Sequence, residues 1–327
     1  MQKRAFPVLF IGHICSCNIG WNSSYSCRRA DDLVQEQAEP ENYALTVFTA
    51  QERKEWEPVI KEFEERTGWN VRVETGSAKE MLSQLEKEEA DWDVAFGVSA
   101  DALEEGKEYW QTGKDAWTGY SAVSFVILYN TNVVTYRELP TGWDSLLEPR
   151  WKGRVAVPDP LKSDMAASVL TEAAKNSEKE EFLDLLAENM QYQMPETFKE
   201  VEQGISDGRY SIGVTSEEAA KAMLAAGQDV DYIDPEEGEC FFEDGTAIRK
   251  RTPNLDASEA FVTYTTCDDT KWLLRTQLLR QPAEDVAAEN DRSDEDLKQR
   301  YSRQQEVLNI WKLIMEEKSG SAHEQEQ

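Results

Sequence analysis

From Ala44 onward, short apolar runs alternate with amphipathic stretches, and this alternation constrains the fold more than any other feature. Ala44–Thr49, Val71–Thr75 and Asp93–Gly97 have the length and composition of strands. Between the first two, apolar residues recur at helical spacing, and Gly68 is placed to end that helix. Strands separated by helices of about 10–15 residues predict a parallel sheet with both faces covered. We therefore expect an α/β fold.

A second unit of the same kind is expected to begin near Ser121, because Ala122–Leu128 is a continuous apolar run that predicts a buried strand. The chain is then expected to return to the first unit through Glu236–Ile248. The remaining expected elements are a strand at 154–157, helices at 165–174, 180–188 and 197–207, a strand at 211–214, a helix at 217–226, a strand at 230–233, and helices at 256–266 and 271–279.

The last predicted helix begins at Ser293, since Asp296 three residues later completes a capping-box pattern. Its inward stripe is expected to consist of Leu297, Tyr301, Gln304, Leu308, Trp311 and Met315. Residues 317–327 are expected to be a disordered tail that frays from Gly320.

Residues 140–160 are rich in Trp, Pro and Gly. Trp143–Leu147 predicts a short amphipathic turn, and Lys152-Gly153 is expected to reverse the chain into the strand at 154–157. Pro158 and Pro160 then stop that strand, so Asp159 is expected at its carboxyl end.

This segment resembles the pattern "PxxWxDLLdPkWKGkiampDP" of the extracellular solute-binding proteins that feed ABC importers. The resemblance is to the group that includes ferric-iron, phosphonate and sugar-phosphate binders, and it covers roughly Leu45 to Trp311. It implies a type II periplasmic-binding-protein fold, in which two α/β lobes are joined by crossovers around a ligand cleft. One lobe would comprise residues 44–120 plus 235–316, and the other 121–234.

The first residues have the features of an export signal. A basic start is followed by the apolar run Ala5–Ile14, which is too short to span a bilayer but suits a secretory h-region. Ile14-Cys15-Ser16-Cys17 resembles a bacterial lipobox with Cys17 as the acylated residue. We expect a signal peptide at 1–17, a polar tether at 18–43 and an extracytoplasmic protein, lipid-anchored to the cell membrane or periplasmic. A buried amphipathic segment and a misassigned start codon are the alternatives.

Composition excludes several classes of function. The chain has 64 acidic residues against 35 Lys and Arg, a net charge of −29, whereas a nucleic-acid binder needs a basic footprint. Its two histidines, His13 and His323, lie in the leader and the tail, which removes most His-dependent hydrolytic and zinc chemistry from the folded part. No dinucleotide or P-loop glycine pattern is present. We therefore expect no enzyme, no cofactor and no resident metal.

Small polar residues recur between a predicted strand and the helix that follows it. They are Thr49 and Ala50, Ser77 and Ala78, Ser163, and Thr215. Ligands collect at the carboxyl ends of strands in open α/β sheets, and helix N-termini there favour anions. The alternative is that each hydroxyl only caps its helix.

The family resemblance adds residues to this candidate site. Trp117 and Tyr120 belong to a segment similar to the family's "WtGls" near the hinge, and Glu217 and Glu218 match the acidic pair of its "GitfED" turn. In ferric-binding members, tyrosines near this turn supply phenolate ligands. Thr-Ser-Glu-Glu stands here instead, which argues against direct ferric coordination.

The resemblance implies the substrate-binding lipoprotein of an ABC importer, a monomer that closes over a small polar, anionic solute and presents it to a membrane permease. A phosphonate or a sugar phosphate would suit such a site. One alternative is a sensor that presents its closed form to a membrane receptor kinase, and another is a metal- or polyamine-binding importer component. The sequence leaves open whether Cys240 and Cys267 pair, although thiols are favoured.

Overall fold

Nine strands of one mixed sheet form the framework of the computed structural model, which describes residues 43–111, 116–238, 240–287 and 294–325. Along the main path the strand order is β2-β1-β3-β8-β4-β6-β5, and β7 and β9 also pair with β4. The strands are β1 (Leu45–Thr49), β2 (Val71–Thr75), β3 (Val94–Ser99), β4 (Thr118–Asn130), β5 (Val155–Ala156), β6 (Ile212–Ser216), β7 (Val230–Ile233), β8 (Cys240–Ile248) and β9 (Gln281–Pro282).

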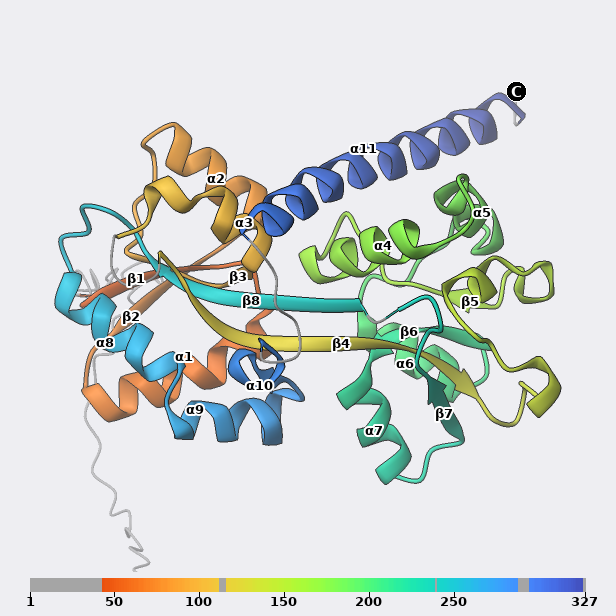
Figure 1. Cartoon of the computed structure of the whole chain (residues 1–327), viewed down its shortest axis with the longest axis horizontal. Coiled ribbons are helices and arrows are strands. Elements are labelled where there is room, and N and C mark those ends of the chain that lie inside the picture. Colours follow the sequence, from red (N-terminus) through yellow and green to blue (C-terminus); the bar gives the residue numbers. More distant parts are fainter. Residues whose placement is uncertain (1–42, 112–115, 239, 288–293, 326–327) are drawn as a thin grey trace, which may run out of the picture. The chain divides into compact units, whose positions relative to one another are not determined.

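Helices surround the two ends of this sheet. The helices are α1 (Arg53–Thr67), α2 (Ala78–Glu86), α3 (Ala100–Glu105), α4 (Asp164–Asn176), α5 (Phe182–Asn189), α6 (Phe198–Ser206), α7 (Glu217–Ala225), α8 (Leu255–Thr265), α9 (Asp268–Leu273), α10 (Ala283–Ala287) and α11 (Asp294–Gln325). Helices α1–α3, α8 and α9 gather around β1–β3, which we call the first half. Helices α4–α7 gather around β5–β7, the second half (Figure 1).

The long strands β4 and β8 run side by side from one half to the other (Figure 1). β8 pairs with β3 through residues 244–248 and with β4 through residues 240–246. Toward its other end, β4 pairs with β6 and β7. The expected parallel arrangement holds for β1 with β2 and β3, and for β5 with β6. All pairings of β4 and β8 are antiparallel, so the sheet is mixed. It is also continuous, because these two strands run through both halves.

Both faces of the first-half sheet are buried. Val47 and Phe96 point into a cluster with α1, α8 and α9, whereas Phe48 and Val98 point into a cluster with α2 and α3. The same alternation occurs along β4 in the second half. This pattern explains the nearly continuous apolar strands, since helices cover the sheet from both sides.

Helix α11 contacts both halves. It packs on α3 of the first half and on α4 and α5 of the second. Most of the predicted inward stripe is confirmed, but Val307 is fully buried where Leu308, only half-buried, was expected. Arg300 adds ion pairs to Asp101 of α3 at 3.7 Å and to Glu172 of α4 at 3.3 Å. The helix continues past Gly320 to Gln325, since a single glycine costs a helix only about 1 kcal/mol.

The segment at 140–160 folds largely as predicted. Trp143–Leu147 is a 3₁₀ turn, Gly153 reverses the chain with φ 73°, and β5 follows. Trp143 and Trp151 are buried in the second-half core. The carboxylate of Glu237 accepts hydrogen bonds from the backbone N–H groups of Trp143 and Asp144, at 2.9 and 3.1 Å, and so fixes the turn.

Other predictions differ from the structure or lie outside it. The helix expected at 271–279 ends at Leu273 and continues as a π turn to Leu278, and α3 and β9 were not predicted. Cys240 and Cys267 are thiols, as favoured. The leader, Cys17, the tether up to residue 42 and Ser293 lie outside the described residues.

If α11 fastens to the core through its buried stripe, Trp311→Ala should lower the free energy of unfolding by about 3–5 kcal/mol, because a large buried side chain is lost. Leu313→Ala on the exposed side of the same helix should change it by less than about 0.5 kcal/mol. Urea unfolding followed by circular dichroism measures both. Equal effects of the two variants would show that the helix is not docked as described.

Candidate functional site

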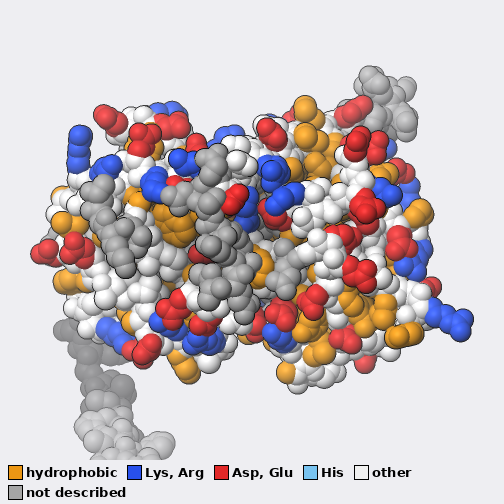
Figure 2. Space-filling model, viewed as in Figure 1, with side chains coloured by type: hydrophobic (Ala, Val, Ile, Leu, Met, Phe, Trp, Pro, Cys, Tyr) orange, Lys and Arg blue, Asp and Glu red, His pale blue; other side chains and the backbone are white. Residues whose placement is uncertain are grey.

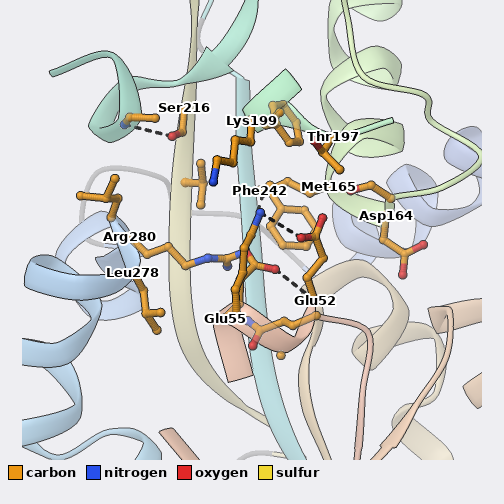
Figure 3. Close-up of a pocket in the computed structure, with 18 of the residues that line it drawn as sticks. Glu52, Glu55, Asp164, Met165, Thr197, Lys199, Ser216, Phe242, Leu278 and Arg280 are labelled. Atoms are coloured by element: carbon orange, nitrogen blue, oxygen red, sulfur yellow. Dashed lines mark hydrogen bonds and ion pairs between the residues drawn. The ribbon is translucent and has the colours of Figure 1, made fainter. Parts of the chain in front are cut away.

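A cavity of about 360 Å³ lies where the two halves meet, at the carboxyl ends of β1 and β6. Its wall includes the starts of α1, α4, α6 and α7, together with the turn that precedes β9. Two apolar residues of the long strands contribute to the wall: Val123 of β4 and Phe242 of β8 (Figure 3). The strand-end position is the one that the sequence predicted for a ligand site.

The four helix starts bring polar groups to this cavity. Their N-cap residues, Glu52, Ser163, Thr197 and Ser216, all line it. The three hydroxyls accept backbone hydrogen bonds from the first turns of their own helices, at 3.1–3.3 Å. Each helix start nevertheless has further N–H groups and a partial positive charge. The cavity can therefore receive a negatively charged group.

Most charged side chains in the wall are already paired. Lys54 Nζ lies 2.9 Å from Glu52 Oε2, and Lys162 forms an ion pair with Glu196. Arg280 is only 4% exposed and donates to Glu55 at 3.0 Å and to Asp244 at 2.7 Å. Three cations and four carboxylates take part in these pairs, so the pairs add no net positive charge to the cavity.

Arg280 is the most tightly held of these groups. Asp244, fully buried on β8, also accepts hydrogen bonds from Gln51 Nε2 at 2.9 Å and from the backbone and hydroxyl of Ser121. Burial lowers the pKa of Arg280, but Glu55 and Asp244 outweigh this and hold it above its ordinary value. Gln51 fits because Gly97 has no side chain: a Cβ there would lie 2.3 Å from Gln51 Cδ.

Besides Asp164 of α4, Lys199 and Glu202 of α6 are the wall residues whose charges are not neutralised in this way. Among the described residues, neither forms an ion pair. Lys199 extends from α6 into the space that Arg280 faces from the other side (Figure 3). The hydroxyl of Thr215 donates to Glu202 Oε1 at 2.7 Å. Burial raises the pKa of the Glu202 carboxyl, against the effects of Thr215, Lys54 and Lys199.

Of the residues predicted for the site, Ala50 and Ser163 line the cavity. Thr49 lies directly behind it, fully buried, and its hydroxyl accepts from the Gln51 backbone at 3.2 Å. Thr215 is also fully buried and reaches the cavity only through Glu202, whereas its neighbour Ser216 lines the wall.

Glu217 and Glu218 point to other partners. Both lie within 3.3 Å of Lys221, and Glu218 also accepts from Gln281 Nε2 at 2.6 Å. Neither lines the cavity.

The two aromatic residues are also engaged elsewhere. Trp117 donates to Glu104 Oε2 at 3.2 Å. Tyr120 is 2% exposed and packs edge-on to Phe96 at 4.7 Å, and burial raises the pKa of its phenol well above the ordinary value. Neither residue lines the cavity, so contact of Trp117 or Tyr120 with a solute stays a prediction.

Ser77 and Ala78 form the start of α2, which lies outside the cavity wall. Ser77 accepts from the Glu80 backbone at 3.2 Å, and Glu80 accepts from the Ser77 backbone at 2.8 Å, a complete capping box. The Ala78 N–H donates to Asp164 Oδ2, 3.0 Å away at the start of α4. A carboxylate of the protein itself therefore occupies the anion position predicted here.

Lys199, Glu202 and Arg280 were not singled out by sequence reasoning. Lys199 and Glu202 follow the helix-capping Thr197 and could have been found by extending the search one turn into each helix. Arg280 follows a π turn and meets Asp244 36 positions away along the chain, a contact that no local pattern indicates. Within the described residues, no group of three or more His, Cys, Asp or Glu side chains is arranged to hold a metal ion.

The chain is similar to known proteins over most of its length. Residues 94–305 match the sequence profile of the family described as bacterial extracellular solute-binding protein. Iron uptake protein A1 of Synechocystis sp. is 22% identical over an alignment of 324 positions, which covers 89% of this chain and 86% of that protein.

Solved structures show the same fold. The ferric binding protein from Campylobacter jejuni superposes with a TM-score of 0.66 at 17% identity, covering 83% of this chain and 99% of its own. The periplasmic binding protein AfuA of Actinobacillus pleuropneumoniae, solved with fructose-6-phosphate, has a TM-score of 0.68 at 14% identity, covering 83% and 98%. These are type II periplasmic binding proteins, and the described residues share their fold.

Asp164 should make the stability of the protein depend on pH. Burial, together with the nearby Glu80, raises its pKa in the folded state against the effect of the Ala78 N–H. The proton is therefore held more tightly in the folded chain, which adds to the free energy of unfolding. This contribution is complete below the unfolded pKa of about 3.9 and is lost as pH rises through the folded pKa. The free energy of unfolding of wild type minus that of Asp164→Asn should decrease as the pH is raised from 4 to 8. Urea unfolding measures this difference. A difference that rises with pH would contradict the raised pKa.

Ser77→Ala should lower the free energy of unfolding by about 1 kcal/mol, because the capping hydroxyl is lost. Ser77→Gly should lower the free energy of unfolding by only about 0.3 kcal/mol, since glycine is itself a tolerated N-cap. Thermal unfolding of the two variants beside wild type makes the comparison. An unchanged stability in Ser77→Ala would mean that the capping box contributes nothing.

Proposed function

The chain belongs to the family of bacterial extracellular solute-binding proteins, and on this premise we propose that it captures a small anionic solute, such as a phosphonate or a sugar phosphate. Members of the family bind small solutes outside the cytoplasm and work with ABC permeases, so this chain is an extracytoplasmic solute-binding protein of the ABC-importer type. The family consists of binding proteins rather than enzymes.

The observation that carries the proposal is the convergence of four helix starts on one cavity. The starts of α1, α4, α6 and α7 each direct partial positive charge and N–H donors toward the same volume of about 360 Å³. Lys199 adds a full positive charge that no carboxylate of the described residues neutralises within ion-pair distance. An anionic group entering the cavity would gain charge-assisted hydrogen bonds from both sources.

The net charge of −29 does not oppose this proposal at short range. Acidic and basic side chains are mixed across the face shown in Figure 2. Screening at physiological ionic strength reduces the long-range repulsion beyond about 8 Å. Local donors therefore determine whether an anion stays bound.

Capture would proceed by closure of two lobes, which we assign to residues 44–120 plus 235–316 and to residues 121–234. This division is supported by β4 and β8, the strands that connect the two halves. The cavity lies where these halves meet, so a hinge motion of the two strands would open and close it. The proposal includes a monomer that delivers its solute to an ABC permease, anchored by a lipid on Cys17.

Among the described residues, no helix is long and apolar enough to cross a bilayer.

A thermal-shift screen tests the capture of an anion. The probes are inorganic phosphate, methylphosphonate and glucose 6-phosphate, with glucose as the uncharged comparison. A probe at 100 times its dissociation constant should stabilise the protein by about 2.7 kcal/mol. Stabilisation by glucose alone would overturn the anionic assignment, and stabilisation by none of the probes would count against this choice of solute class.

Lys199→Met should weaken the binding of the best anionic probe about tenfold to a hundredfold, because one charge-assisted hydrogen bond is lost. Lys221→Met is the matched control: it removes the same charge from α7, outside the cavity wall, and should leave affinity unchanged. Calorimetric titration measures both dissociation constants. Equal losses in the two variants would indicate a general field effect rather than a contact at Lys199.

A further inference from the structure

Glu202 is one of two carboxylates of the cavity wall without an ion pair among the described residues; the other, Asp164, accepts a hydrogen bond from the Ala78 backbone N–H at 3.0 Å. Glu52, Glu55 and Glu196 each have a lysine or arginine as an ion-pair partner. Glu202 is half-buried, lines the cavity and forms no ion pair among the described residues. Among the described residues, its carboxylate accepts one hydrogen bond, from the Thr215 hydroxyl at 2.7 Å. The second oxygen of this carboxylate is not buried, so it is open to a further donor from a solute.

Thr215 holds this carboxylate in place. Thr215 is fully buried on β6, so its side chain is held in place by the strand and by its surroundings. The bond engages Oε1 of Glu202, and no side chain or backbone group of the described residues donates to the other carboxylate oxygen. Glu202 is therefore an oriented acceptor in the cavity wall rather than a freely rotating surface side chain.

Glu202 stands next to the cation of the proposed anion site. Lys199 and Glu202 are three residues apart on α6, so their Cβ atoms are about 5–6 Å apart on one face of the helix. Both line the cavity. One turn of helix thus offers a donor for an anionic group and, a short distance away, an acceptor that lacks a charged partner.

We propose that Glu202 is a specificity-determining residue, which selects solutes that carry an ammonium group close to the anionic group received by Lys199. This inference rests on the proposed function, because it assumes that the anion enters this cavity. Thr215 is a positioning residue for Glu202. A solute with only an anionic group would leave the carboxylate unpaired, and it would also be repelled by it.

The competing explanation is that Glu202 serves only as a nearby negative charge for Lys54 and Lys199. Both lysines lie near enough to lower the pKa of the Glu202 carboxyl. In that case, removing the charge would strengthen the binding of every anion equally, whether or not the anion carried an amine. The two explanations therefore predict opposite changes for an amine-bearing probe.

Matched pairs of probes distinguish them. Each pair shares an anionic group and differs in the amine: phosphoethanolamine with ethyl phosphate, 3-aminopropanoate with propanoate, and taurine with ethanesulfonate. We expect at least one amine-bearing probe to bind wild type more tightly than its partner. Glu202→Gln should weaken that probe about tenfold to a hundredfold, as expected for a lost hydrogen bond between charged groups. The amine-free partner should bind the variant as well as or better than wild type.

Two further variants complete the experiment. Thr215→Val removes the positioning hydroxyl at nearly constant volume and should weaken the amine-bearing probe about fivefold, with little effect on its partner. Glu180→Gln removes the same charge at an exposed position away from the cavity and should change neither. Because Thr215→Val keeps Glu202 itself, it tests the proposal even if Glu202→Gln does not fold.

The outcomes separate this inference from the proposed function. If amine-free probes bind as tightly as their partners in wild type, or if Glu202→Gln strengthens both members of a pair equally, the role of Glu202 is refuted while anion capture stands. If no amine-bearing probe binds, the role of Glu202 is refuted as well. Anion capture itself is judged by the separate screen with phosphate, methylphosphonate and glucose 6-phosphate.

Discussion

The buried pair of Asp244 and Arg280 holds together the parts of the chain that surround the cavity. Asp244 is on β8, Ser121 on β4, Gln51 in the turn after β1, and Arg280 in the segment before β9. The other three residues meet at the Asp244 carboxylate, which has no access to solvent. Removing one partner of such a pair typically costs about 3–5 kcal/mol, because the remaining charge stays buried. The cavity floor is therefore fixed by electrostatics as much as by apolar packing.

This pair also explains why Arg280 differs from Lys199, although both cations face the same space (Figure 3). Arg280 is balanced by two carboxylates, Glu55 and Asp244, and its guanidinium is committed to them. Lys199 is exposed and has no such commitment among the described residues. Identical formal charges thus have different uses: one maintains the architecture, and the other remains available to a solute.

The sequence predicted the general fold well because apolar periodicity and turn residues act locally. The turn at Trp143–Leu147, the strand at Val230–Ile233 and most of the buried stripe of α11 follow from such patterns. The antiparallel pairing of β4 with β8 could not be predicted from such patterns, since its direction depends on residues more than a hundred positions apart. The π turn before Arg280 was not predicted either, because the helical pattern of the sequence continues through it.

The site was harder to predict for the same reason. A cavity lies at the strand ends where the sequence predicted a ligand site, and Ala50 and Ser163 line it. Small hydroxyl residues, however, serve both as caps and as ligand donors, and only the three-dimensional contacts distinguish Ser77, which completes a capping box, from Ser163, which also faces the cavity. Thr215 shows a third use, since its hydroxyl orients another side chain.

The hydrogen bond from Ala78 to Asp164 has a consequence for any dissolved anion. Groups held on the same chain meet at an effective concentration of the order of millimolar or more, and this concentration does not change with dilution. A free carboxylate or phosphate at micromolar concentration would have to displace a competitor that is always present. The start of α2 therefore always has an internal carboxyl group as its acceptor, and selection among external solutes falls to those helix starts that the chain leaves without one.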